Sequence, residues 1–303
     1  MHAVIFAYHN IGVRCLKVLL ARGVKVDLVL THEDNPREAI WFGSVAASCR
    51  EYDIPFIAPA DPKSPELFTR IAAIRPDFIF SFYYRHMLPV ELLALARHGA
   101  YNMHGSLLPK YRGCAPVNWA VLHGETETGA TLHEMAVKPD AGAIIAQTSV
   151  PILPDDTAVE VFGKVTVAAE QTLWNALPAM LAGRAPKLPN ELAKGSYFGR
   201  RKPEDGRIDW SQPAQQVYNL HRAVAPPYPG AWTAIGGKNL IIGSARLSSG
   251  SKPDLSPGLT TVDNRILGVC GDGRVLSIQE LLADGKPVSP TELRQLLDAP
   301  SSA

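Results

Sequence analysis

Asn102 and His104 are the residues of this chain best placed for chemistry, because they stand two apart at the end of an apolar run. Residues 100–104 are predicted to form a short strand, and on an extended chain positions i and i+2 point to the same face. A histidine, with an ordinary pKa of about 6.5, can take a proton from an attacking amine, and an asparagine NH2 can donate to an oxyanion. The pair therefore favours acyl transfer to an amine. Such pairs are also common as hydrogen-bonding groups of loops, so the pair alone leaves both interpretations open.

The loop that follows this pair has a constrained path, since Gly105, Pro109, Gly113 and Pro116 punctuate it. The chain has no G-x-S-x-G motif, and nothing marks Ser106 as a nucleophile. Direct attack by the substrate amine is therefore expected rather than an acyl-enzyme. In open α/β sheets ligands bind beyond the carboxyl ends of the strands, which is where the pair would lie.

The first two thirds of the chain alternate between strand and helix patterns. The predicted strands are 2–7, 24–31, 54–57, 77–82, 100–104 and 130–136, with 144–150 as an antiparallel partner. The predicted helices are 11–21, 37–52, 65–74 and 156–181. This alternation predicts an α/β fold with a Rossmann-like, doubly wound and mostly parallel sheet.

The composition changes after Gly183, where prolines and glycines interrupt the periodicity. A chain of 303 residues is also long for one core. We predict an N-terminal catalytic domain at 1–185, a linker at 186–205 and a C-terminal domain at 206–303. A helix is expected at 214–223, and the short apolar runs after it predict a small OB-like β-barrel, ending in a frayed tail after Asp298.

Bulk composition excludes several classes of protein. The net charge is +1 and no basic patch stands out, which argues against a nucleic-acid partner. No apolar stretch is long enough to cross a bilayer, and the start is unlike a signal peptide, so a cytoplasmic protein without membrane insertion is expected. The four cysteines are far apart and no metal-site spacing is present, so no metal is expected. The first strand is followed by one glycine of a dinucleotide fingerprint, Gly12, which argues against NAD.

The motif NMHGSLLPKYRG, residues 102–113, resembles the signature of the 10-formyltetrahydrofolate-dependent formyltransferases. That family also carries an aspartate in a D-x-G turn some distance downstream, and Asp140 fills this place. The family comprises enzymes that formylate glycinamide ribonucleotide, methionyl-tRNA or sugar nucleotides, and a hydrolase that deformylates the folate. The resemblance implies a one-carbon transferase with 10-formyltetrahydrofolate as co-substrate.

The resemblance is closest to the formyltransferase domain of the bifunctional polymyxin-resistance enzyme. It is carried by FAYHN, THEDNP, FGSVA, FIFSFYYRHML, NWAVLHGETETGATLH, DAGAIIAQ, FGRRKPEDGRIDW and AVAPPYPGAW. It implies formylation of UDP-4-amino-4-deoxy-L-arabinose in lipid A modification, by an enzyme without the decarboxylase domain of that relative. Methionyl-tRNA formyltransferase and formyltetrahydrofolate hydrolase are the alternatives, and the oligomeric state is left open.

The resemblance also implies roles for single residues. His104 would act as general base or proton shuttle, and Asn102 would stabilise the oxyanion. Asp140 would orient His104 or relay protons, with its pKa expected to be raised by burial. Folate contacts are implied for His86, Met87, Leu88, Cys114, Ala136, Val137, Lys138, Pro139 and Asp140. Cys114 stands where the resembling domain has an arginine, so folate affinity is expected to differ.

The acceptor would be held by other residues. Arg200 and Arg201 are expected to bind its pyrophosphate, because arginine makes bidentate bonds to phosphate. Tyr228 is expected to cover the uracil or the sugar, and His9 and Asn10 to reach the acceptor from the end of the first strand. The remaining histidines are expected to be structural or surface groups; they include His98, His123, His133 and His221.

Overall fold

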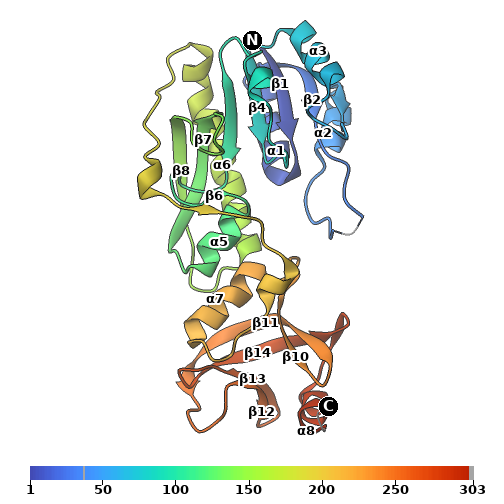
Figure 1. The fold of residues 1–303 in the computed structure, drawn as a ribbon, viewed down its shortest axis with the longest axis vertical. Coiled ribbons are helices and arrows are strands. Elements are labelled where there is room, and N and C mark those ends of the chain that lie inside the picture. The colour runs from blue at the N-terminus through green and yellow to red at the C-terminus, as the bar shows by residue number, and fades with distance from the viewer. Residues whose placement is uncertain (37, 300–303) are drawn as a thin grey trace. The chain divides into compact units, whose positions relative to one another are not determined.

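The computed structural model describes residues 1–36 and 38–299, and the chain divides into two compact units (Figure 1). Unit 1 consists of Met1–Pro116, Glu127–Pro151 and Phe162–Gly199, and unit 2 of Val117–Thr126, Ile152–Val161 and the chain from Arg200 onward. The chain leaves unit 1 for the last time after Gly199, within the segment predicted to be a linker. No helix in the described part of the chain is long and apolar enough to span a membrane.

Unit 1 contains a seven-stranded sheet in the order β3-β2-β1-β4-β5-β7-β8. The strands are β1 (His2–Ala7), β2 (Lys25–Leu30), β3 (Phe56–Ile57), β4 (Phe78–Phe82), β5 (Ala100–His104), β7 (Glu127–Glu134) and β8 (Ile144–Pro151). The pairs from β3 to β5 are parallel, and β7 and β8 are antiparallel. The mostly parallel, Rossmann-like sheet is therefore confirmed.

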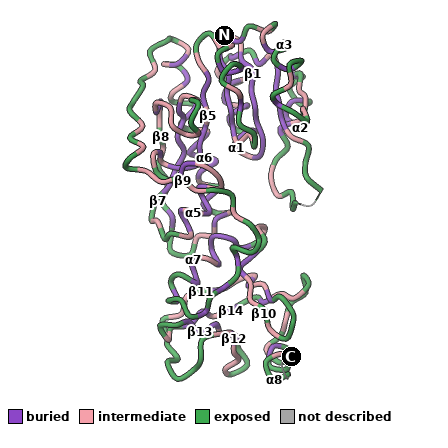
Figure 2. The backbone as a smooth tube through the Cα atoms, in the orientation of Figure 1, coloured by how far each residue is buried: buried purple, intermediate pink, exposed green. Residues whose placement is uncertain are grey.

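Helices alternate with these strands along the chain. They are α1 (His9–Ala21), α2 (Val45–Glu51), α3 (Pro65–Ile74), α4 (Val90–Leu93), α5 (Pro116–Leu122) and α6 (Ala158–Leu181). Helix α5 from Val117 and the first turn of α6 belong to unit 2. Residues 3–7 of β1 have no exposed surface, so both faces of the central strand are covered (Figure 2). On one face Phe6, Leu28 and Ile79 share a hydrophobic cluster with Leu67 and Ile71 of α3.

The predicted helix 37–52 is wrong over its first half, because α2 begins only at Val45. Ser44 is the N-cap, and its hydroxyl accepts a hydrogen bond from Ala47 N at 3.1 Å. The segment before it is held as a loop by a tertiary contact, in which Gly43 N donates to Asn10 Oδ1 at 2.7 Å. Arg37, where the predicted helix starts, lies outside the described residues.

Unit 2 is built on a six-stranded antiparallel sheet that forms a half-barrel. Its strands are β10 (Ala231–Ile235), β11 (Lys238–Ser251), β12 (Gly258–Val262), β13 (Arg265–Val269), β14 (Arg274–Ala283) and β15 (Lys286–Pro287). Helix α7 (Ala214–Val224) packs against β11 and β14, and α8 (Pro290–Asp298) closes the described chain. The small C-terminal β domain is thus confirmed, while residues 300–303 of the predicted frayed tail lie outside the described residues.

Candidate active site

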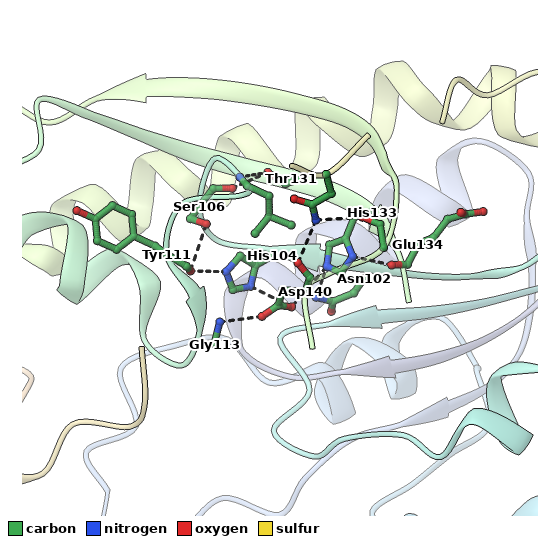
Figure 3. A network of polar contacts seen from close by, with 12 residues as sticks. Asn102, His104, Ser106, Tyr111, Gly113, Thr131, His133, Glu134 and Asp140 are labelled. Carbon is green, nitrogen blue, oxygen red and sulfur yellow. Dashed lines mark hydrogen bonds and ion pairs between the residues drawn. The ribbon is translucent and has the colours of Figure 1, made fainter. Parts of the chain in front are cut away.

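Strand pairing between β5 and β7 assembles the centre of the site (Figure 3). Asn102 and His104 follow the alternation of β5, and the antiparallel register places His133 of β7 directly opposite Asn102. Asp140 approaches from the loop after β7, and its carboxylate lies near both imidazole rings. The three predicted catalytic residues are therefore brought together, with His133 as a fourth member.

The hydrogen bonds of His104 define which ring nitrogen is available. Its Nε2 lies 2.8 Å from the carbonyl oxygen of Tyr111, which can only accept, so Nε2 carries the hydrogen. In the neutral ring Nδ1 then holds the lone pair, and it lies 3.6 Å from Asp140 Oδ1. His104 is 6% exposed, so this geometry is held within the protein. Nδ1 can accept a proton with a carboxylate beside it to stabilise the resulting imidazolium.

His133 sets the orientation of Asn102. Its Nδ1 donates to the carbonyl oxygen of Glu134 at 2.7 Å, so Nε2 is an acceptor in the neutral ring, and it also lies 3.5 Å from Asp140 Oδ1. Asn102 Nδ2 lies 3.1 Å from that Nε2 and donates to it, so the NH2 side of the amide is defined. The second N–H of Asn102 can then donate to a bound carbonyl or oxyanion.

Asp140 is an anion held in a strained backbone conformation. Its φ is 50°, in the left-handed region, and Gly113 N donates to Oδ2 at 2.8 Å. Burial favours the neutral acid, but the imidazoles of His104 and His133, which attract the carboxylate when they are protonated, and the Gly113 N–H outweigh it, so the pKa of Asp140 lies below its ordinary value. The expectation that burial raises this pKa is wrong, because it omitted these three partners.

Backbone and side-chain bonds fix the loop between β5 and β6 (Arg112–Gly113). Ser106 Oγ donates to the carbonyl oxygen of Lys110 at 2.7 Å. Thr131 Oγ1 donates to Ser106 O at 2.6 Å and accepts from Leu108 N at 3.1 Å. The Ser106 hydroxyl therefore supports the loop.

Residues 187–198, which we call the bracing segment, hold this loop from the other side. Tyr111 N donates to Ser196 Oγ at 2.9 Å, and Arg112 N donates to Ser196 O at 3.0 Å. Strand β9 (Tyr197–Phe198) of the segment pairs in parallel with β6. The Phe198 ring stacks on the Tyr111 ring, with 5.5 Å between the ring centres. Most of the predicted linker is therefore part of the site.

The same segment also holds the turn that carries Asp140. Asn190 Nδ2 donates to Asp140 O at 3.0 Å and to Gly142 O at 3.1 Å. Leu188 forms an antiparallel bridge with Ile144, which anchors the segment beside β8. One stretch of chain thus fixes both loops of the catalytic centre.

The residues predicted to contact folate lie on two loops after β4 and β7, together with Cys114. Leu88 is buried in the core cluster, with Met135 packed against that cluster. Met87 and Val137 are 51% and 77% exposed, so each loop presents an apolar side chain to solvent. Such surface suits an aromatic ligand, which would cover it. Among the others, His86, Ala136 and Lys138 are exposed, and Pro139 and Cys114 are half-buried.

The acceptor residues predicted at the end of β1 occupy the topological switch point, since β1 lies between β2 and β4. His9 is 4% exposed and stacks on Phe42, with 3.8 Å between ring centres. Burial and the charge of Arg85 lower its pKa to about 3, so the ring is neutral near pH 7. Asn10 uses its side-chain oxygen to hold Gly43.

The remaining acceptor residues belong to unit 2. The Arg201 guanidinium lies 4.8 Å from the Trp119 ring centre, and its Nη2 donates to Asp205 O at 2.9 Å. Tyr228 N donates to Ala225 O at 3.2 Å in the proline-rich turn after α7. The roles of Arg200, Arg201 and Tyr228 in binding stay predictions.

Two structural features of the site were missed by sequence reasoning. His133 was assigned to the structural and surface histidines, although its alternating position in ATLHEMA marks one face of a strand. The bracing segment gives no local signal beyond its prolines and glycines. Within residues 1–36 and 38–299, no group of three or more His, Cys, Asp or Glu side chains could hold a metal ion.

This fold and site define a class of protein: an α/β enzyme whose Asn-His-Asp centre lies at the carboxyl ends of the sheet's strands. Residues 13–177 match the family described as formyl transferase, and residues 200–295 match the formyl transferase C-terminal domain. The chain belongs to the formyl transferase family and is a formyltransferase.

Solved structures with the same fold include several sugar N-formyltransferases. One is an N-formyltransferase from Helicobacter canadensis in complex with folinic acid and dTDP-3-aminofucose, at TM-score 0.73 and 21% identity, covering 91% of this chain and 98% of that chain. Another is WlaRD, a sugar 3N-formyl transferase solved with dTDP and 5-N-formyl-THF, at TM-score 0.73 and 19% identity, covering 94% and 98%. HypX from Aquifex aeolicus with tetrahydrofolic acid matches at TM-score 0.66 and 19% identity, over 98% of this chain and 47% of its own length.

Proposed function

We propose that this enzyme transfers a formyl group from 10-formyltetrahydrofolate to the amino group of a nucleotide-linked sugar. UDP-4-amino-4-deoxy-L-arabinose, on the route to lipid A modification and polymyxin resistance, is the first choice of acceptor. The observation that carries the proposal is the four-residue network in which His104 offers Nδ1 beside the Asp140 carboxylate while His133 orients Asn102. The solved sugar N-formyltransferases with folates and dTDP-linked ligands support this choice of donor and acceptor classes.

His104 is the proposed proton acceptor. Attack by the amine on the formyl carbon produces an ammonium group, and Nδ1 can take its proton because Nε2–H is committed to the Tyr111 carbonyl. The bond between the formyl carbon and N10 of the folate then breaks, and the imidazolium of His104 returns the proton to the departing N10. Asp140 is ionised and 3.6 Å away, so it stabilises the imidazolium that forms. The depressed pKa of Asp140 makes it the charge partner rather than the first base.

Asn102 is the proposed electrophilic group. One N–H of its amide is held by His133, and the other can donate to the formyl oxygen as negative charge develops there. A donor already fixed in direction costs no reorganisation during the reaction, which is why its bond to His133 matters.

The donor and the acceptor have separate proposed contacts. Folate is proposed to bind across the loops at 86–88 and 136–140 and beside Cys114, where exposed Met87 and Val137 would be covered. Arg200, Arg201 and Tyr228 are proposed contacts of the acceptor's pyrophosphate and base or sugar. His9 and Asn10 would approach the acceptor at the switch point of the sheet.

The test is formylation of a panel of UDP- and dTDP-linked amino sugars with 10-formyltetrahydrofolate, followed by mass spectrometry. Initiator methionyl-tRNA and a reaction without any amine are included. Formylation of an amino sugar, abolished by His104→Ala, is the expected result. Formylation of the tRNA, or release of formate without acceptor, would replace the proposal with one of the two alternative activities.

A further inference from the structure

Arg112 is a buried cation without a protein partner. It is 7% exposed, and its Nε and Nη1 atoms are both buried and make no hydrogen bond. Among the residues that the structure describes, no carboxylate lies within salt-bridge distance of its guanidinium. A guanidinium stays protonated at any pH that proteins tolerate, so Arg112 cannot escape the cost of burial by losing its charge.

Several other arginines have hydrogen-bond partners for at least one terminal guanidinium nitrogen, although the Nε atoms of Arg22, Arg201 and Arg222 are also buried without one. Arg14 binds Glu170 and Arg85 binds Glu38, each through two nitrogens. Arg222 is as buried as Arg112, at 4% exposed, but its Nη1 and Nη2 donate to Asp156 O and to Asn219 Oδ1. Arg112 differs from these buried arginines because two of its guanidinium nitrogens are buried without a hydrogen bond, and a buried charge is tolerated if a ligand supplies the opposite one.

The backbone of Arg112 is fixed beside the catalytic network. The carbonyl oxygen of Tyr111, just before it, accepts the hydrogen bond of His104, and the N–H of Gly113, just after it, donates to Asp140. Ser196 accepts the Arg112 N–H at 3.0 Å, so the bracing segment holds this position. The guanidinium therefore lies no farther than the length of an arginine side chain from backbone that contacts His104 and Asp140.

We propose that Arg112 binds the diphosphate of the nucleotide-linked acceptor. The planar fork of a guanidinium matches phosphate oxygens in a bidentate manner, and a prearranged backbone reduces the entropy lost on binding. The diphosphate neutralises the buried charge and directs the sugar that it carries toward Asn102 and His104. This inference rests on the proposed function for the identity of the anion.

The test uses inorganic pyrophosphate as the probe and isothermal titration calorimetry of the full chain. The wild type is expected to bind it, and Arg112→Met to bind it roughly 10- to 100-fold more weakly through loss of a charge-assisted contact. Arg112→Lys should fall between them, because it keeps the charge and loses the fork. Arg70→Met is the matched control, since Arg70 is exposed on α3, and it should bind like the wild type.

Competition identifies the natural anion. Pyrophosphate should displace a UDP-linked sugar and leave folate binding unchanged; displacement of folate alone would overturn the assignment. Absence of pyrophosphate binding by the wild type, or equal affinity in Arg112→Met, overturns it as well. Should Arg112→Met fail to unfold cooperatively, Arg112→Lys carries the comparison, and unchanged affinity there counts against the proposal.

The outcomes also separate this inference from the proposed function. A wild type that formylates no amino sugar yet binds pyrophosphate through Arg112 refutes the acceptor and keeps the anion site. An enzyme that formylates an amino sugar, and whose affinity for pyrophosphate does not depend on Arg112, keeps the proposed function and refutes the anion site.

Discussion

Replacing Asn190 by alanine tests whether the bracing segment positions Asp140. The change removes the two bonds that Nδ2 donates to Asp140 O and Gly142 O, at 3.0 and 3.1 Å. Each is worth about 1 kcal/mol, and a residue held in an unusual backbone region costs about 1–3 kcal/mol. The bonds and the strain at Asp140, with φ of 50°, are thus of similar size, so the turn should relax without Asn190.

We expect Asn190→Ala to lower kcat by roughly 10- to 100-fold, because a displacement of about 1 Å at a catalytic group can cost this much. KM for the acceptor should change little, whereas KM for folate should rise, since Asn190 bonds to the turn of Asp140 and residues 136–140 are proposed folate contacts. Asn190→Asp should be as impaired as alanine, because a carboxylate is similar in size but cannot donate to the two carbonyls. The measurement is steady-state formyl transfer to whichever acceptor the panel identifies.

Asn175→Ala is the matched control, since Asn175 is exposed on α6. Thermal melts of each variant show whether the protein is folded at the assay temperature. A merely structural role for Asn190 would lower the melting temperature and leave kcat of the folded enzyme unchanged. A folded Asn190→Ala enzyme with kcat within about twofold of the wild type would refute the positioning argument.

Three further changes probe the same network. His133→Ala should slow formyl transfer roughly 10- to 100-fold with folate binding retained, because Asn102 loses the acceptor that orients it; equal rates would contradict this. Asp140→Asn should lower kcat by about 100-fold or more. The folded pKa of Asp140 lies below its unfolded pKa, so its stabilisation is present above pH of about 4 and is lost as the pH falls toward the folded pKa. Acid titration of the unfolding free energy should therefore be steeper for the wild type than for Asp140→Asn, and parallel curves would refute it. Gly113→Ala should destabilise the enzyme measurably in denaturant unfolding, because φ is 96° and a Cβ would overlap the Phe198 carbonyl oxygen.

The parts of the fold that follow local periodicity were predictable from sequence. The strands at 2–7 and 100–104 and the helix at 65–74 have the predicted bounds, because burial on a regular element leaves a regular pattern. The helix predicted at 37–52 failed where a tertiary bond, from Gly43 to Asn10, outweighs local preference.

Only those features of the site that depend on residue type and on position within a strand could be predicted from the sequence. Asn102 and His104 share a face because they stand two positions apart on a strand, and Asp140 came from the resemblance. The partner of Asn102 could not be found in the same way, because the register of β5 against β7 selects His133. Asn190 and Ser196 are separated from their partners by 50 and 85 positions, and no periodic pattern reports a pairing at that distance.

The charge of Asp140 shows why contacts between residues far apart in the sequence determine the chemistry of the site. Burial alone predicts a neutral acid, whose O–H would hydrogen-bond to Nδ1 of His104 and occupy the lone pair that should accept the proton. The Gly113 N–H and the rings of His104 and His133 reverse that outcome, so the carboxylate stays ionised and Nδ1 of His104 is left to accept the proton. All three partners depend on the loop at 105–113 or on the β5–β7 register, and the bracing segment holds that loop. Weakening the segment should therefore impair proton transfer before it impairs acceptor binding, so kcat is expected to fall before KM for the acceptor rises.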